Sequence, residues 1–409
     1  MTRRKRNNGM EETDMAFGLS NRVKGIAPSP TLSIDAKTKE LIAQGRDIVN
    51  LSVGEPDFGT PEPACQAGIA AIQEGFTKYT AVPGINELRK AIVKKLLEEN
   101  GLAYEIDEII VSNGAKHSLF NAFMALCNPG DEVILPAPYW VSYPEMIRLA
   151  DAEPVIVLTD ESTGFKLTPD MLQKAITPRT KALLLNSPSN PTGAVYSREE
   201  LQALAEVIEQ HEFYVISDEI YEKMVYGIEH VSIASLSEAM KKRTLVVNGF
   251  SKAFAMTGWR VGYIAADRMI VKAMTSFQSQ TTSNPASISQ RAAVKALDCF
   301  DTRAIELFNK RRDYVLKRLR GMPLIECIEP QGAFYVFPNV ANIIGKSYNG
   351  TKIDSANTFA TLLLEHANIA LVPGEGFGAP NNIRISYAVS DQDLQKAMDR
   401  LEAFLKEVE

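Results

Sequence analysis

A lysine that could act as a nucleophile lies in the segment Val246–Arg260, which reads VVNGFSKAFAMTGWR. Lys252 follows a short β-branched run that predicts a buried strand, so we expect it just past the carboxyl end of that strand, where open α/β sheets bind ligands. Phe250 and Phe254 would partly desolvate the amine and favour its neutral form, which is the form that attacks a carbonyl group. A solvated surface lysine is the alternative interpretation.

Arg260 lies eight residues after Lys252 and offers a fixed guanidinium fork that suits a phosphate group. A lysine that forms a Schiff base beside a phosphate anchor is what pyridoxal 5′-phosphate requires. The segment therefore predicts a pyridoxal-phosphate site, provided that other strand ends supply the remaining groups.

Three other predicted strands end in polar segments, namely SNGAK, NSPSNPTG and SDEIYE. In SNGAK the amides of Ala115 and Lys116, together with the dipole of the helix they open, would form a phosphate cradle. The rigid turn NSPSNPTG would present the amide of Asn190. SDEIYE carries Asp218 and Tyr221 three residues apart, on one face if a helical turn follows. Ordinary turns and a helix cap are the alternatives.

These residue types match the chemistry of pyridoxal phosphate. A carboxylate such as Asp218 against the pyridine nitrogen keeps it protonated, so that the ring withdraws electrons. Donors such as Tyr221 and Asn190 would stabilise the anion of the ring's phenolic oxygen. Trp140, in APYWVSYPE, could stack on the ring face, although a tryptophan in the hydrophobic core is the alternative.

Arg384 lies inside the alternating segment IRISYA, where a charge is expensive unless it is paired. Its guanidinium could bind a carboxylate with two hydrogen bonds and so orient an amino acid over the cofactor. A head group that reaches solvent is the alternative.

The elements that must position these residues predict an α/β fold. Apolar runs alternate with helical segments, which indicates a mostly parallel sheet covered by helices on both faces. We expect a disordered tail at 1–18, a large domain at 51–299, and a smaller α+β domain built from both chain ends, 19–50 and 300–409. The site would lie in the cleft between the two domains.

Composition excludes several functional classes. The net charge of −6 gives no electrostatic footprint for nucleic acid or an anionic membrane, and no apolar run is long enough for a membrane span. Four scattered cysteines without a C-x-x-C pair indicate neither a disulfide framework nor a metal site. The basic, acid-containing tail does not match a secretory signal or a transit peptide, so we expect a cytoplasmic protein.

The ordered motifs YT, SNGAK, PYWVSYPE, NSPSNPTG, SDEIYE, NGFSKAFAMTGWR, GAFY and IRISYA resemble the class I pyridoxal-phosphate aminotransferases. The likeness covers the chain from about Leu19 onward and is greatest to the bacterial and plant-type aspartate aminotransferases, some of which also use prephenate. It implies the fold of the type I pyridoxal-phosphate transferases with a seven-stranded sheet, a homodimer with shared active sites, and a role in amino-acid metabolism.

The resemblance also implies a role for each matched residue. Lys252 would bind the cofactor covalently, and Asp218, Asn190, Tyr221 and Trp140 would contact its ring. Other roles follow in the same way: phosphate contacts for Ala115, Ser251 and Arg260, a contact across the dimer for Tyr79, and substrate contacts for Gly54, Trp140, Asn190 and Arg384.

Specificity is where this chain departs from many class I aspartate aminotransferases, which bind the distal carboxylate through an arginine of the partner subunit. The segment Ser276–Gln290 contains no arginine. Lys116 is the candidate replacement, because a lysine at a helix start is disfavoured unless an anion lies nearby. Thr31, in PSPTLSI, matches the position that partners this lysine in the aspartate/prephenate enzymes. A solvent-facing Lys116 is the alternative.

The expected reaction is amino transfer between aspartate or glutamate and 2-oxoglutarate or oxaloacetate, with prephenate as a further substrate. Two alternatives use the same cofactor. One is an aromatic or broad-range aminotransferase, and the other is a β-lyase acting on cysteine conjugates. A regulator in which such a module serves a DNA-binding domain is a third hypothesis, but the segment before Leu19 is too short for that domain.

Overall fold

The computed structural model describes residues 18–26 and 30–409. The predicted tail at 1–18 lies, apart from Gly18, outside these residues. No helix in the described part of the chain combines the length and the low polarity that a membrane span needs. All four cysteines fall within the described ranges and are unpaired.

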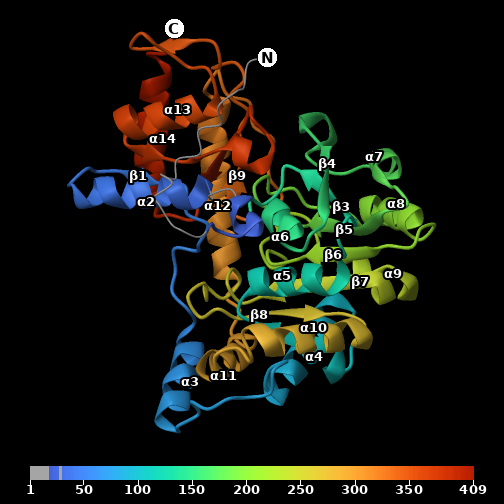
Figure 1. Ribbon diagram of the computed structural model, residues 1–409. Coiled ribbons are helices and arrows are strands. Elements are labelled where there is room, and N and C mark those ends of the chain that lie inside the picture. Colours follow the sequence, from blue (N-terminus) through green and yellow to red (C-terminus); the bar gives the residue numbers. More distant parts are fainter. Residues whose placement is uncertain (1–17, 27–29) are drawn as a thin grey trace.

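A seven-stranded sheet forms the centre of the larger group of elements, with strand order β2-β8-β7-β6-β5-β3-β4 (Figure 1). β8 is antiparallel to both of its neighbours, and the other strands all run in one direction. The predicted fold class is confirmed. The strands are β2 (Ile109–Ser112), β3 (Glu132–Ala137), β4 (Glu153–Leu158), β5 (Thr180–Asn186), β6 (Tyr214–Asp218), β7 (Thr244–Gly249) and β8 (Gly262–Ala265).

Helices cover both faces of this sheet, which explains why its central strands are apolar throughout. Alternate side chains of one strand enter different cores: Leu184 packs with α5, α6 and α10, whereas Leu185 packs with α7 and α8 on the opposite face. The helices around the sheet are α3 (Glu62–Gln73), α4 (Asn86–Asn100), α5 (Ala115–Leu126), α6 (Tyr143–Leu149), α7 (Pro169–Ala175), α8 (Arg198–Ile208), α9 (Glu238–Arg243), α10 (Arg268–Thr281) and α11 (Ser287–Ala296).

The elements from the two ends of the chain pack together in a second group, at the top of Figure 1. β1 pairs in parallel with β12, which ties the segment near residue 50 to the carboxyl-terminal part, and β13, β14 and β9 form an antiparallel sheet. These elements are α2 (Pro30–Ala43), β1 (Val49–Asn50), α12 (Arg303–Arg320), β9 (Tyr335–Val336), β10 (Ser347–Tyr348), β11 (Thr351–Lys352), α13 (Ala356–Leu362), β12 (Ile369–Ala370), β13 (Val372–Pro373), β14 (Ile383–Ser386) and α14 (Asp391–Leu405). The short helix α1 (Asn21–Lys24) precedes them, and its Arg22 forms an ion pair with Asp151 just before β4.

Candidate active site

A cavity of about 770 Å³ lies at the carboxyl edge of the large sheet, where the second group of elements faces it. Segments that are far apart in the sequence line this cavity, because the carboxyl ends of parallel strands meet at one edge. The sequence-predicted residues that line it are Gly54, Ala115, Lys116, Trp140, Asn190, Asp218, Tyr221, Ser251, Lys252, Arg260 and Arg384.

Lys252 lies on the turn that follows β7, as the sequence predicts. Its Nζ donates a hydrogen bond to the carbonyl of Gly54 and lies 5.8 Å from the centre of the Tyr221 ring. Burial lowers the pKa of Lys252 to about 8, and the guanidinium groups of Arg384 and Arg260 add to this effect while Glu55 opposes it. About a tenth of the amine is therefore neutral at pH 7, far more than for a lysine of ordinary pKa, and the neutral form is the nucleophile.

Asp218 is the last residue of β6 and is only 3% exposed. Its Oδ2 accepts a hydrogen bond from the hydroxyl of Tyr143 at 2.7 Å, and its Oδ1 accepts one from the amide of Ile220 at 3.2 Å. Burial raises the pKa of Asp218 to about 6 despite these hydrogen bonds. A cationic partner in the cavity would stabilise this buried carboxylate. Our sequence analysis assigned no role to Tyr143, although it lies three residues after Trp140 in the motif PYWVSYPE.

The turn before α5 and the turn before β8 together form a cradle for an anion. α5 begins at Ala115 without a side-chain cap, so its first amides and its dipole face the cavity. A Cβ atom on Gly262 would lie 2.2 Å from the amide nitrogen of Ala115, so only glycine allows this close approach. Arg260 forms the other side of the cradle. Its backbone φ is +58°, and its guanidinium donates a hydrogen bond to the carbonyl of Thr257 at 2.8 Å.

Arg384 lies in β14 with only 3% exposure, and burial lowers its pKa. Its Nη1 donates to the side-chain oxygen of Asn190 at 3.0 Å, and its Nη2 donates to the carbonyl of Ser52 at 2.6 Å. The buried Nε atom has no hydrogen-bond partner among the described residues. A charged group in this position is stabilised by an anionic ligand, which agrees with the predicted carboxylate site.

Two tyrosines connect the predicted ring contacts with the predicted substrate contacts. The hydroxyl groups of Tyr221 and Tyr335 lie 2.9 Å apart, and the Arg384 guanidinium lies 4.5 Å from the centre of the Tyr335 ring. Burial raises the pKa of both tyrosines, so both remain protonated and can donate hydrogen bonds. Our sequence analysis used the motif GAFY, which contains Tyr335, but gave this residue no role.

Trp140 and Lys116 lie at the rim of the cavity. The Trp140 ring packs edge-on against Tyr143, with ring centres 5.2 Å apart. The exposed Lys116 places its Nζ 4.7 Å from the centre of the Trp140 ring. Desolvation of its ammonium group and the charge of Arg260 lower the pKa of Lys116, and no carboxylate among the described residues opposes this effect. An anion at the rim would supply the missing partner.

One predicted site residue does not line the cavity, and the side chain of another lies outside the described part of the structure. Tyr79 lies between α3 and α4 and is 90% exposed, so within this chain it faces solvent. Thr31 belongs to α2, but its side chain lies outside the described part of the structure. A contact of Tyr79 with a neighbouring subunit and a contact of Thr31 with substrate both stay predictions.

The donor set fits pyridoxal phosphate. The cavity offers one partner for each functional group of that cofactor: an anion cradle at Ala115, Ser251 and Arg260 for the phosphate, Asp218 for the pyridine nitrogen, Asn190 and Tyr221 for the phenolic oxygen, and the Lys252 amine for the aldehyde. The guanidinium of Arg384 would then be available to a substrate carboxylate.

Comparisons with known proteins agree with this geometry. The family model "Aminotransferase class I and II" matches residues 46–401. The aspartate aminotransferase of Geobacillus stearothermophilus is 48% identical over 392 residues, which are 95% of this chain and 99% of that protein. The aspartate/prephenate aminotransferase of Cereibacter sphaeroides is 48% identical over 396 residues, with 95% and 99% covered. The crystal structure of the Rhizobium meliloti aspartate aminotransferase superimposes with a TM-score of 0.93 at 46% identity and covers 96% of this chain and 100% of its own.

Proposed function

Because the chain belongs to the class I and II aminotransferases, which use pyridoxal 5′-phosphate, we propose that it moves the amino group between a dicarboxylic amino acid and an oxo acid. The amino donors are L-aspartate and L-glutamate, and the acceptors are 2-oxoglutarate and oxaloacetate. Prephenate is a further acceptor, as the name of the Cereibacter sphaeroides relative suggests. A cytoplasmic location is part of this proposal.

The observation that carries this proposal is the pair of cationic groups in one cavity. Arg384 lies deep in the cavity, and Lys116 lies at its rim. Arg384 would bind the α-carboxylate common to all amino acids, while Lys116 would bind the distal carboxylate of aspartate or glutamate. A flexible ammonium group accommodates dicarboxylates of different length better than a rigid guanidinium fork.

Each residue around the cavity then has a separate role in the proposed reaction. When bound, pyridoxal phosphate supplies an aldehyde that takes up the amino group and a ring that withdraws electrons from Cα. Asp218 would hold a proton on the pyridine nitrogen, and Asn190 and Tyr221 would donate to the phenolic oxygen. Lys252 Nζ would take up and return the proton at the substrate's Cα. Ala115, Ser251 and Arg260 would hold the phosphate.

A panel of amino donors with 2-oxoglutarate as acceptor tests the proposed substrate class. Aspartate should give the highest kcat/KM, and alanine and phenylalanine should be much poorer donors. A preference for aromatic donors would contradict the proposal, as would rapid release of ammonia and pyruvate from cystathionine in the absence of any oxo acid.

A further inference from the structure

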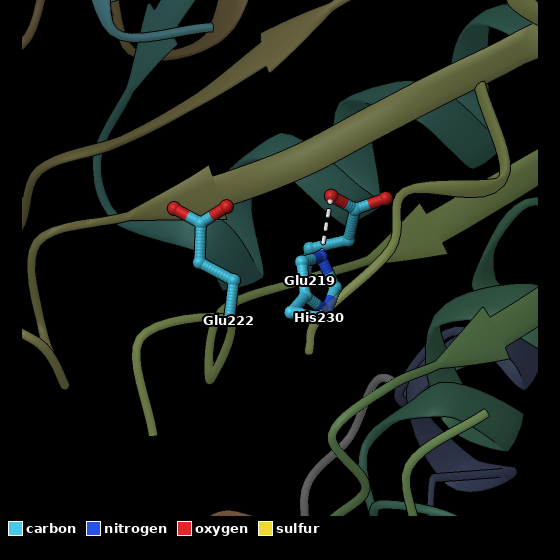
Figure 2. Close-up of side chains that lie close together, drawn as sticks. All are labelled: Glu219, Glu222 and His230. Carbon is cyan, nitrogen blue, oxygen red and sulfur yellow. Dashed lines mark hydrogen bonds and ion pairs between the residues drawn. The ribbon is translucent and has the colours of Figure 1, made fainter. Parts of the chain in front are cut away.

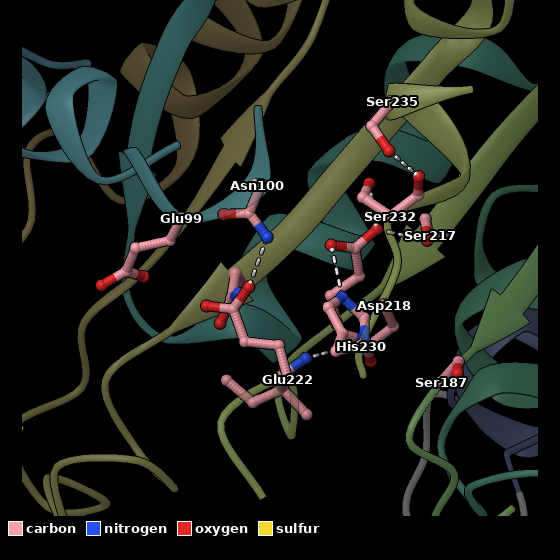
Figure 3. A network of polar contacts seen from close by, with 12 residues as sticks. Glu99, Asn100, Ser187, Ser217, Asp218, Glu222, His230, Ser232 and Ser235 are labelled. Carbon is pink, nitrogen blue, oxygen red and sulfur yellow. Dashed lines mark hydrogen bonds and ion pairs between the residues drawn. The ribbon is translucent and has the colours of Figure 1, made fainter. Parts of the chain in front are cut away.

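A second group of largely buried polar side chains lies behind the turn that follows β6, away from the cavity (Figures 2 and 3). Glu219 is 1% exposed, Glu222 9% and Lys95 8%, and the side chain of His230 is 7% exposed. None of these residues lines the cavity described above. We call this group the rear cluster, and its members are Lys95, Asn100, Glu219, Glu222 and His230.

One arm of the rear cluster ties the turn to the carboxyl end of α4. Lys95 Nζ forms an ion pair with Glu222 and donates a hydrogen bond to the side-chain oxygen of Asn100 at 2.8 Å. Asn100 Nδ2 donates in turn to Glu222 Oε2 at 2.9 Å. Both carboxylate oxygens of Glu222 are therefore held by groups on one rigid helix.

The other arm ties the turn to the segment that precedes α9. The Nε2 atom of His230 lies 3.2 Å from Glu219 Oε2, and Figure 2 draws this contact. The hydroxyl groups of Ser217 and Ser232 donate to Glu219 Oε1 at 2.8 Å and 2.7 Å. Because an ionised carboxylate only accepts, Nε2 of His230 carries the proton in this contact.

The turn between the arms points its side chains to two sides. Asp218 and Tyr221 line the cavity, whereas the residues that follow each of them, Glu219 and Glu222, enter the rear cluster. The amide of Glu222 donates to the carbonyl of Glu219 at 2.9 Å, which holds the backbone of the turn. A shift of that backbone would therefore move Asp218 and Tyr221 as well.

Charge balance in the rear cluster comes from the chain's own cations. The ligand atoms of Glu219, Glu222 and His230 lie within 4.8 Å of one another, as a metal site would require, but the ammonium group of Lys95 already contacts Glu222. Burial disfavours every charge here, yet Lys95 and His230 bring the pKa of Glu222 down to about 2, and Glu219 raises that of His230. A divalent ion would add like charge beside Lys95, so these observations favour an ion-pair network.

Other titratable groups surround the rear cluster and belong to its electrostatics. Glu99 lies 3.6 Å from Lys95 and is more exposed, with 38% of its side chain accessible. Lys223 is a further charged neighbour, since its Nζ lies 2.7 Å from Glu99 Oε2. Tyr104 and Tyr263 also lie near the cluster but are uncharged, because burial raises the pKa of both.

We propose that the rear cluster is a positioning device that holds Asp218 against the cofactor's pyridine nitrogen and Tyr221 against its phenolic oxygen. Its residues act through these two side chains and do not touch cofactor or substrate. A fixed geometry matters here because misplacement of a catalytic group by about 1 Å can cost on the order of a hundredfold in rate. This inference rests on the pyridoxal-phosphate chemistry of the family and not on the choice of aspartate as substrate.

The test compares Glu222→Gln and Lys95→Met with two matched controls in the cofactor-loaded protein. Glu99→Gln removes a carboxylate from the exposed side of the same ammonium group, and Lys95→Arg keeps the buried positive charge. Three readouts are taken for each variant: the pH midpoint of the bound cofactor's visible absorbance, kcat and KM for aspartate, and the melting temperature.

We expect Glu222→Gln and Lys95→Met to move the absorbance midpoint by about one pH unit and to lower kcat about tenfold to a hundredfold, with much smaller changes in KM. Glu99→Gln and Lys95→Arg should stay close to the unmodified protein. An unchanged midpoint and kcat in a variant with a lowered melting temperature would overturn the proposal, because the cluster would then serve stability alone.

A second arm of the test does not depend on the buried Lys95–Glu222 pair. His230→Gln keeps a donor that can reach Glu219 but removes the imidazole ring, and its absorbance midpoint should also shift. If Glu222→Gln and Lys95→Met fail to fold, an unchanged midpoint in His230→Gln overturns the proposal. The absorbance readout needs only bound cofactor, so a protein that rejects aspartate would refute the proposed substrate and leave this test intact.

Discussion

Lys116 is the residue on which the proposed preference for dicarboxylates depends. Replacing it with alanine should lower kcat/KM for aspartate about tenfold to a hundredfold, on the order of 1.4 to 3 kcal/mol for a lost charge-assisted contact. Turnover of alanine or phenylalanine should change far less, because these donors have no distal carboxylate. Steady-state kinetics with each donor measures the difference. Equal losses for all donors would assign Lys116 to the cofactor or the fold.

Lys252 should show its lowered pKa in the rate at which cofactor-free protein takes up pyridoxal phosphate. A lysine is charged below its pKa, so the rate should rise with pH up to about 8 and then level off. An ordinary lysine with a pKa near 10.4 would continue to gain rate above pH 9. Stopped-flow absorbance across this pH range makes the measurement, and a rate that still climbs steeply at high pH would contradict the pKa assigned to Lys252.

The anion cradle between α5 and β8 depends on a glycine where two segments meet. Gly262→Ala should weaken cofactor binding by about tenfold or more, because overpacking a tight contact costs roughly 1–3 kcal/mol. A Cβ atom there would lie 2.2 Å from the amide nitrogen of Ala115. Gly59→Ala is the matched control, since a Cβ atom at Gly59 meets nothing within 4 Å. Cofactor dissociation measured by equilibrium dialysis should separate the two variants, and equal affinities would argue against the cradle.

Most elements that position the site were predictable because their boundaries carry strong local signals. The strand Ile109–Ser112 and the helix that begins at Ala115 lie where an apolar run followed by SNGAK predicts them. The strand ends that bring Asp218 and Lys252 to the sheet edge follow from the same rule. After Trp140 the chain makes a turn, and helix α6 begins at Tyr143.

Three strands show where local sequence and long-range contacts each decide the structure. β4 lies at the sheet edge with partly exposed residues, yet its sequence EPVIVL has the continuous apolar run that predicts a strand. β8 has only four residues, starts with glycine and runs against its neighbours, so its local signal is weak. The segment DIVNLSV from Asp47 has the apolar content of a longer strand, but only Val49–Asn50 form one, because they pair with β12 from the other end of the chain. Such long-range pairing leaves no periodic signal in the local sequence.

Two residues of the site, Tyr143 and Tyr335, have no role that the sequence predicts, because their contacts join distant segments of the chain. Tyr143 reaches Asp218 across 75 positions, and Tyr335 reaches Tyr221 across 114. Neither contact leaves a spacing that a single sequence reveals. The same holds for the rear cluster, where Lys95 and Glu222 are separated by 127 positions.

At the scale of the whole molecule, the exposed Tyr79 supports our proposal that the active enzyme is a homodimer with shared sites. A tyrosine with 90% exposure in one chain is available to the cavity of a second. Mixing Tyr79→Phe with Lys252→Ala protein should restore one competent site in each heterodimer, because one of its two cavities then contains both native residues. Activity is measured after subunit exchange has been verified, and no recovery would contradict a shared site.

The division into 51–299 and a second unit formed by 19–50 and 300–409 likewise remains our proposal. Arg311 of α12 donates to Asp57 at 2.8 Å and to Asp391 at 2.7 Å, so one buried guanidinium joins both sides of this boundary. Limited proteolysis of the loaded protein should cut first near residues 50 and 300 if the two units are separable. Cleavage inside the large sheet at the same rate would contradict the division.

The most direct test of the proposed amino transfer compares the unmodified protein with Lys252→Ala. Each protein is loaded with pyridoxal phosphate and mixed with L-aspartate in the absence of an oxo acid. The unmodified protein should lose the cofactor's visible absorbance band within a single turnover, release one oxaloacetate per site and recover the band when 2-oxoglutarate is added. Lys252→Ala should not complete this cycle, because it lacks the amine that we propose moves the proton at the substrate's Cα. A normal absorbance band with full turnover in Lys252→Ala would contradict the account at its centre.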